Sequence, residues 1–285
     1  MSGFRIIALK LALLLSICNM VSADEGGNKA PGLSHFPLNE IYSRYTADPY
    51  RTSFSAKAIF LNRTDIPDTG TRRFGLRIGG ALPLMQYNWQ KVQSQLVLEA
   101  GFHGHFDADH SQDNIGWDGI YSLYYAVRFN EALAVRIGRR HFSSHVGDEY
   151  IERTGRRRIN YTREEWRAGL SWQVKNNMDV YFDFAYASTL RNKNKQKPWR
   201  YQIGAQFDQP GAFYETGLGW YVAADVSSYQ ENNYAINTTL QVGLLVPRDE
   251  RQWRFFIEYY NGRMQIGEFF EHNESYFGLG LTIDI

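Results

Sequence analysis

Two residues that could act together as a nucleophile and a base lie near the middle of the chain, where His141 is followed two positions later by Ser143. On an extended strand, side chains two residues apart point to the same side, with Cβ atoms roughly 6 to 7 Å apart, so the imidazole and the hydroxyl can meet. An imidazole that takes the hydroxyl proton makes serine a nucleophile. The spacing alone is weak evidence, because His-x-Ser occurs by chance in many chains, so the surrounding elements decide its meaning.

A third residue could hold the imidazole in one tautomer. Counting back by twos from Trp166, an outward position of the following segment, leads to Asn160. This parity predicts that Asn160 begins the next antiparallel strand on the same face and at the same height as His141. An asparagine that accepts a hydrogen bond from the ring N–H would complete a catalytic triad with His141 and Ser143. The alternative is that Asn160 is an ordinary loop-end residue.

Residues 1–23 are predicted to be a secretory signal peptide. Positive residues precede an apolar run that ends at Ile17, and small residues end at Ala23, where a signal peptidase would cut. The single cysteine, Cys18, lies inside this segment, so the mature chain is expected to lack disulfides, thiolate chemistry and cysteine metal ligands. A lipoprotein signal ending at Cys18 is the alternative, although Ile17 is bulky where a small residue is expected.

The composition favours an all-β protein of a membrane. The net charge is +1, which argues against a nucleic-acid partner. Beyond the signal there is no run of 18 apolar residues and the mean hydropathy is −0.45, so no membrane-spanning helix is predicted. Aromatic residues nevertheless make up 15% of the chain, which suits β-strands.

Residues 24–50 are polar and irregular, and we interpret them as an N-terminal periplasmic arm without a site of its own. From residue 51 onward, apolar and polar residues alternate, which predicts strands with one apolar and one polar face. About twelve such segments are predicted, at 52–62, 73–87, 91–106, 119–129, 132–143, 160–174, 178–189, 199–207, 212–226, 234–246, 251–260 and 274–285.

The connections between these segments alternate between short turns and long loops. An even number of strands of about ten residues, with short turns at one end and long loops at the other, is typical of a transmembrane antiparallel β-barrel of the Gram-negative outer membrane. The barrel is predicted to span 51–285. A soluble β-sandwich or a lipocalin-like barrel is the alternative, but these lack the systematic alternation in loop length.

The parity of the segment 132–143 predicts which way the histidine and the serine point. Leu133 and Ile137 are lipid-facing positions, and continuing by twos from them reaches His141 and Ser143. The pair is therefore expected on the lipid-facing wall, at the level of the outer leaflet. Polar groups on that wall cost free energy, so they are more informative there than elsewhere.

The run 138–144, together with 160–166, resembles the active-site segment of the outer-membrane phospholipase A family. That resemblance implies a twelve-stranded barrel, a lipid-facing Ser-His-Asn site and the use of calcium. A broader similarity, which covers most of the mature chain, is to the bacterial barrels known as domain of unknown function family 1207, whose name carries no activity. The resemblance to the phospholipases is incomplete, because Ser144-His145 stands where they usually have Asn-Gly and the gap from His141 to Asn160 is longer.

A carboxylate could replace the asparagine. Outer-membrane lipid A deacylases also use His-x-Ser with a carboxylate partner, so Glu149 competes with Asn160 as the third member. Asp148 and Glu149 carry hard oxygen ligands that could help to hold Ca²⁺, or they could only pair with the basic residues that follow them. A second polar cluster could line the outer mouth of the lumen as a metal site or, more simply, as a hydrated rim; its members are His103, His105, Asp107, Asp109, His110 and Asp113.

Three functions stay open at this point. The first is hydrolysis of acyl esters of outer-leaflet lipids, with phospholipid or lipopolysaccharide as the partner. The second is a barrel with a structural or binding role and no chemistry, and the third is a channel for small solutes, although a lumen of this size is expected to be filled by side chains. The sequence leaves a homodimer open.

Overall fold

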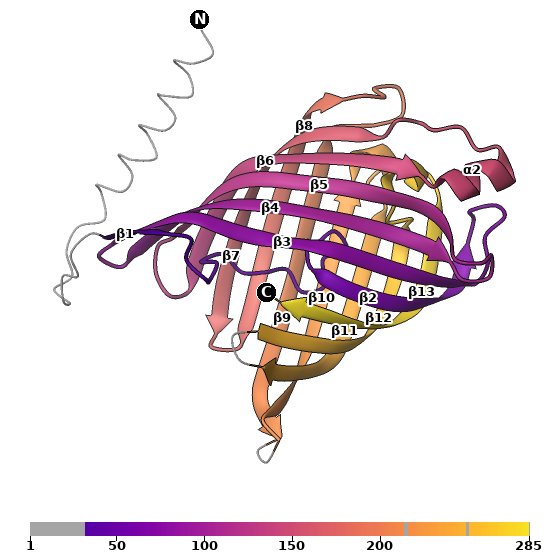
Figure 1. Cartoon of the computed structure of the whole chain (residues 1–285). Coiled ribbons are helices and arrows are strands. Elements are labelled where there is room, and N and C mark those ends of the chain that lie inside the picture. Colours follow the sequence, from indigo (N-terminus) through magenta and orange to yellow (C-terminus); the bar gives the residue numbers. More distant parts are fainter. Residues whose placement is uncertain (1–31, 214–215, 249–250, 285) are drawn as a thin grey trace, which may run out of the picture.

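The computed structural model describes residues 32–213, 216–248 and 251–284, and over these residues the chain forms a closed antiparallel barrel of twelve strands with one short extra strand (Figure 1). The predicted signal peptide lies outside the described residues. The extra strand is β1 (Gly32–His35). The barrel strands are β2 (Phe54–Thr64), β3 (Arg72–Trp89), β4 (Val92–Asp107), β5 (Asp113–Arg128), β6 (Leu133–Val146), β7 (Thr162–Lys175), β8 (Met178–Leu190), β9 (Trp199–Phe213), β10 (Leu218–Tyr229), β11 (Ile236–Arg248), β12 (Arg251–Arg263) and β13 (Asn273–Asp284).

Each barrel strand pairs with its neighbour in sequence, and β13 pairs with β2 to close the cylinder. The predicted fold class and strand count are therefore confirmed. The main differences in bounds are that β5 starts at Asp113 and that β9 continues to Phe213, through the turn predicted at 208–211. In this stretch the backbone of Asp208 pairs with β10. The carboxylate of Asp208 also accepts a hydrogen bond from the guanidinium of Arg254 at 2.7 Å.

Among the residues that the structure describes, helical structure is confined to the loops at the end where the long connections lie. It consists of α2 (Asp148–Thr154) and two short 3-10 turns, η1 (Gln230–Asn232) and η2 (Gly267–Phe269). Helix α2 ends at Gly155, whose φ of 68° is accessible to glycine without strain. In the described part of the chain, no helix is long and apolar enough to cross a membrane.

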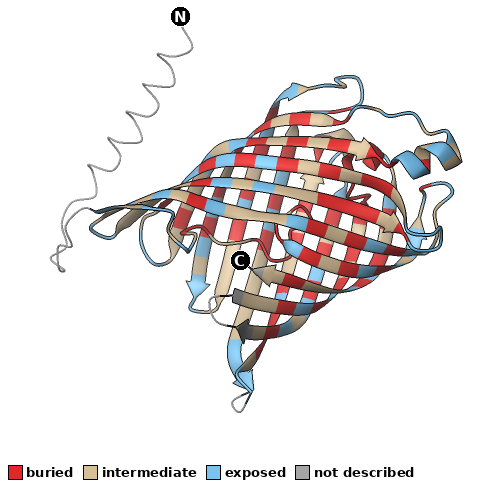
Figure 2. Ribbon diagram, viewed as in Figure 1, coloured by how far each residue is buried: buried red, intermediate tan, exposed pale blue. Residues whose placement is uncertain are grey.

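The outer wall is apolar and the inner wall is polar, which is the reverse of a soluble barrel. Figure 2 shows the alternation of buried and exposed residues along each strand. Leu123, Ile137 and Leu279 are examples of exposed outward side chains, each 47% exposed or more. Buried charged residues such as Arg163 and Asp183 alternate with such positions and face the lumen. This arrangement excludes the lipocalin-like alternative and fits a barrel surrounded by lipid.

Part of the segment predicted as a periplasmic arm lies inside the barrel. The backbone N–H of Ile41 donates to Gln95 on β4, and that of Thr46 donates to Gln206 on β9. The ring of Tyr45 stacks on that of Tyr181 on β8, with centroids 3.6 Å apart. Over 39–53 the arm is therefore an internal plug, and the polar strand faces give its backbone the partners that water would otherwise supply.

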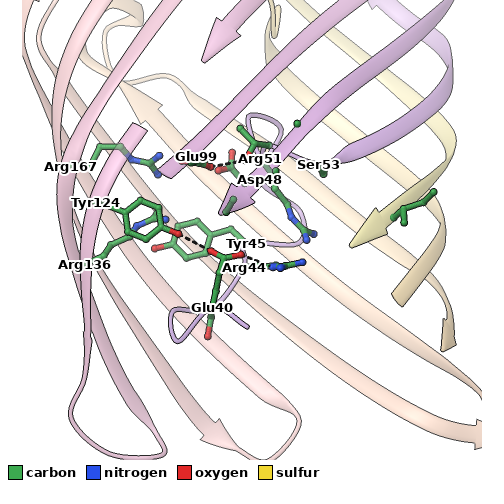
Figure 3. Close-up of a pocket in the computed structure, with 16 residues that line it drawn as sticks. Glu40, Arg44, Tyr45, Asp48, Arg51, Ser53, Glu99, Tyr124, Arg136 and Arg167 are labelled. Atoms are coloured by element: carbon green, nitrogen blue, oxygen red, sulfur yellow. Dashed lines mark hydrogen bonds and ion pairs between the residues drawn. The ribbon is translucent and has the colours of Figure 1, made fainter. Parts of the chain in front are cut away.

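The plug also lines a pocket inside the barrel, which is drawn in Figure 3. There the hydroxyl of Tyr124 donates to Glu40 at 2.7 Å, and Glu40 also pairs with Arg44. Arg136 of β6 lies over the rings of Tyr42 and Tyr45. Wall residues thus hold the plug by hydrogen bonds and cation–π contacts, and the Glu40–Arg44 ion pair lies within the plug itself.

The two edges of β3 are used differently. One edge pairs with β4 along almost its whole length, from Arg73 to Trp89. The other edge pairs with β2 only over 72–77, and nearer the short-turn end it pairs with β1 over 85–88. Strands β1 and β2 therefore share one edge of β3, and the plug is the chain between them.

Candidate functional site on the outer wall

Strand β6 places His141 and Ser143 on the outward face, as the parity predicts. Both are partly exposed, whereas Arg140, Phe142 and Ser144, which alternate with them, are buried toward the lumen. The two candidate residues therefore lie on the wall that contacts lipid, toward the long-loop end of the barrel.

The imidazole of His141 is held from two sides. Its Nδ1 lies 2.5 Å from Oε1 of Glu164, which faces it directly across the pairing of β6 with β7. Its ring stacks on Tyr121 of β5, with centroids 4.4 Å apart and planes 15° from parallel. An ionised carboxylate accepts the hydrogen of Nδ1, which leaves Nε2 free to act as a base.

Ser143 lies in a gap between two aromatic stacks. On one side is the Tyr121–His141 pair, and on the other the ring of Trp117 stacks on His145 at 4.1 Å. Directly across from Ser143 on β5 is Gly119, where an added Cβ would come within 3.4 Å of the serine Oγ. Because residue 119 is a glycine, no side chain stands directly opposite the hydroxyl. Among the described residues, Ser143 Oγ makes no hydrogen bond, either to His141 or to any other group.

Asn160 is not level with His141, so its predicted height along the barrel is wrong. Strand β7 begins at Thr162, which pairs with Ser143, and Glu164 is the residue opposite His141. Asn160 lies four positions before Glu164, about 13 Å along an extended chain. It is exposed and its φ is 58°, a turn conformation that asparagine tolerates.

Glu149 and Asp148 lie in the first turn of α2, in the loop beyond β6. Both are exposed, and Asp148 pairs with Arg158 at 3.2 Å. In the part of the chain that the structure describes, no group of three or more histidine, cysteine or acidic side chains converges as a metal site. The residues predicted to hold calcium therefore do not fit a calcium site, and no chemical step is assigned to a metal.

The helix itself is fixed by Tyr150. This residue is buried against Phe269, and its hydroxyl donates to the carbonyl of Pro67 at 2.7 Å. Burial raises the pKa of the Tyr150 hydroxyl above its ordinary value. Helix α2 is therefore attached to the loop after β2.

The second polar cluster is divided between the lumen and the loops. His103, His105 and Asp107 are buried, and Asp107 accepts from His110 and from the backbone of Gly70. In the loop, backbone and side-chain hydrogen bonds from Arg72 lower the pKa of the exposed Asp109. The loop members thus bind other protein groups, whereas both ring nitrogens of His103 and of His105 are buried without a hydrogen-bond partner among the described residues.

Glu164 is the residue of the site that the sequence does not single out. It shares its parity with Asn160, so the alternation that selects one also permits the other. A further polar neighbour is Arg139, whose Nε lies 3.7 Å from Oε2 of Glu164 and whose guanidinium lies over the ring of Trp166. A histidine, a glutamate and an arginine thus form one polar group on an otherwise apolar wall.

The fold and the lipid-facing wall define the chain as a β-barrel of the Gram-negative outer membrane. It matches the outer membrane phospholipase A from Escherichia coli with a TM-score of 0.57 and 14% identity, over 85% of this chain and 95% of that one. It also matches an outer membrane phospholipase from Salmonella typhi, solved as a dimer with bound calcium, with a TM-score of 0.57 and 14% identity over 86% and 94% of the two chains. At this identity the likeness concerns the fold.

More particularly, the chain belongs to the family of proteins of unknown function DUF1207, whose model matches residues 16–284. No curated protein sequence matches the chain.

Proposed function

We propose that this barrel hydrolyses acyl esters of outer-leaflet lipids, with Ser143 as nucleophile, His141 as general base and Glu164 as the residue that positions His141. The observation that carries the proposal is the contact between His141 Nδ1 and Glu164 beside a serine on the lipid-facing wall. A polar group that faces lipid costs free energy, and here three of them, Ser143, His141 and Glu164, lie on neighbouring positions of the wall.

The chemistry follows from the tautomer. Glu164 accepts the Nδ1 hydrogen, so Nε2 takes the proton from Ser143 Oγ as the hydroxyl attacks the ester carbonyl. The protonated imidazole, stabilised by Glu164, then gives the proton to the leaving alcohol. Water attacks the acyl-serine in the second half of the reaction, with His141 again as base. Proton transfer of this kind contributes about 10²- to 10⁴-fold to the rate.

The position of the serine suits a lipid substrate. The gap beside Gly119 opens outward, where the ester region of a lipid lies below its headgroup. Trp117 and Tyr121 border this gap, and aromatic rings favour the interface between headgroup and acyl chains. A phospholipid and the acyl esters of lipopolysaccharide share this chemistry, and the substrate is to be distinguished by experiment. The phospholipase from Salmonella typhi is a dimer with bound calcium, so both properties belong in the test.

A structural or binding role without chemistry is the second candidate. It is favoured by one observation, since no hydrogen bond joins Ser143 to His141 among the described residues. The channel is less favoured, because the plug and the buried ion pairs fill the lumen.

The test is acyl release from phospholipid vesicles and from lipid A by the purified, refolded barrel, with calcium or with a chelator. Ser143→Ala and His141→Ala are expected to lower the rate by about 10³-fold or more. Glu164→Gln is expected to lower it by about 10- to 100-fold through the loss of the positioning contact, and to alter the pH profile of kcat, because the charge beside His141 is removed. Gly119→Val is expected to block the gap, whereas Gly80→Val, on the outward face of β3 with open space around it, is the control.

Matched variants separate the candidates for the third member. Asn160→Ala and Glu149→Gln are expected to keep the wild-type rate, and Ser228→Ala, another outward serine near the long-loop end of a strand, controls for the loss of a hydroxyl. If folded barrel releases no acyl chain from either lipid, the proposal fails and the structural or binding role replaces it. If Asn160→Ala rather than Glu164→Gln loses activity, the assignment of Glu164 is wrong.

A further inference from the structure

Behind the outer site, on the lumen side of β6, is a chamber with an unusual charge. Four arginines line it together with one glutamate and three aromatic rings. The lining residues are Arg140, Phe142, Tyr161, Arg163, Glu165, Arg200, Tyr229 and Arg263. The chamber leaves room for about one particle the size of a water molecule.

Three of the four arginines have carboxylate partners. Arg163 binds Glu165 at 2.8 Å and Glu231 at 2.6 Å, and Arg263 binds the other oxygen of Glu231 at 2.6 Å. Arg200 reaches Asp183 at 3.2 Å. The partners are themselves shared, because Asp183 also receives two arginines of the neighbouring strands, Arg136 and Arg167.

Arg140 has no such partner. It is 3% exposed, and among the described residues it makes no hydrogen bond and no ion pair within 4.0 Å, so that its Nε is buried and unsatisfied. Its contacts are with the faces of Tyr50 and Phe142. The positive charges of Arg167 and Arg200 repel its guanidinium. The carboxylates of Glu165 and Glu99 attract it, but neither lies within 4.0 Å. The Nε of Arg200 is also buried without a hydrogen-bond partner, although Oε2 of Glu165 lies 3.9 Å from it.

A buried guanidinium without a counterion is strongly unfavourable, because desolvation is not offset by a partner. We propose that the chamber binds a small inorganic anion of the size of chloride, held between Arg140 and Arg200. The free space suits a monatomic anion rather than a tetrahedral oxyanion. The aromatic rings supply the low-polarity surroundings in which an attraction between an anion and guanidinium groups is strong. This site is independent of the hydrolase proposed above, since its residues face the opposite side of the sheet.

The experiment compares the thermal unfolding of the barrel after refolding in sodium chloride and in sodium gluconate of equal ionic strength. In wild type, chloride is expected to raise Tm in a saturable manner, and gluconate, which is too large for the chamber, is not. Arg140→Gln is expected to weaken the apparent chloride affinity about 10-fold or more, which corresponds to the loss of one charged hydrogen bond. Arg72→Gln removes the same charge from an exposed ion pair with Asp109 and is expected to keep the chloride dependence.

A second measurement does not depend on how the variant folds. Crystals of the wild-type barrel grown in sodium bromide are expected to show an anomalous peak in the chamber, next to Arg140. The proposal is overturned if that peak is missing, if gluconate stabilises as chloride does, or if Arg140→Gln and wild type respond equally to chloride. The lipid hydrolysis assay is not affected by any of these outcomes, so the two proposals can fail separately.

Discussion

The two faces of strand β6 differ in how firmly their side chains are held. On the lumen side, Ser144 accepts a hydrogen bond from the backbone of Glu268 at 2.8 Å, and Arg140 and Phe142 are sealed among rings and charges. On the lipid side, His141 has one carboxylate and one ring as partners, and Ser143 faces a glycine. Stability in this barrel therefore depends mainly on the interior network, and the outer wall can carry reactive groups without being needed for folding.

The largest loss of stability is expected from substitution of Asp183, which binds three arginines inside the lumen. Asp183→Asn leaves their charges uncompensated and is expected to lower the free energy of unfolding by about 3 to 5 kcal/mol. Urea unfolding of the barrel in detergent measures this. Asp148→Asn, at an exposed position of α2, is the control and is expected to change stability by less than about 0.5 kcal/mol. A cost for Asp183→Asn below that of the control would contradict the role of the interior.

An intermediate effect is expected where the plug meets the inner wall. Tyr45→Ala removes a ring that stacks on Tyr181 and lies against Arg136, and is expected to cost about 3 kcal/mol. The same unfolding experiment measures it. Leu38→Ala, at the position just before the plug and 74% exposed, is expected to leave stability nearly unchanged. Equal effects of the two substitutions would show that the plug does not depend on its inward-facing side chains.

The smallest effect is expected on the outer wall, and two consecutive glutamates give the sharpest comparison. Glu164→Gln alters the partly exposed partner of His141 and is expected to cost less than about 1 kcal/mol. Glu165→Gln, one position further along β7, alters the buried partner of Arg163 and is expected to cost several times more. Unfolding midpoints of the two variants test this. A larger loss of stability in Glu164→Gln than in Glu165→Gln would contradict the difference between the two faces.

Much of the barrel follows from the sequence, because lipid on one side and polar groups on the other impose a period of two. That period predicts the twelve strands and also the outward direction of His141 and Ser143. It does not fix height along the axis: Asn160, Thr162 and Glu164 share one parity, and only the path of the loop between β6 and β7 decides which of them faces His141. Because that loop contains the helix α2, the number of residues between the two strands does not give the position at which β7 begins.

The internal plug was missed for a different reason. Its residues show no periodicity, since they are neither strand nor helix, and a polar irregular segment is normally interpreted as exposed. Three tyrosines, Tyr42, Tyr45 and Tyr50, were the available signal, because large rings in such a segment need a surface to pack on.

The shared edge of β3 determines how the plug can move. The chain is clamped to that edge by β1 before it enters the lumen and by β2 after it, at 85–88 and at 72–77. The plug is thus a loop whose two flanking strands are both hydrogen-bonded to β3, so it has no free end. Clearing the lumen would therefore require either separating β1 from β3 or passing the whole segment out as a loop through the short-turn opening.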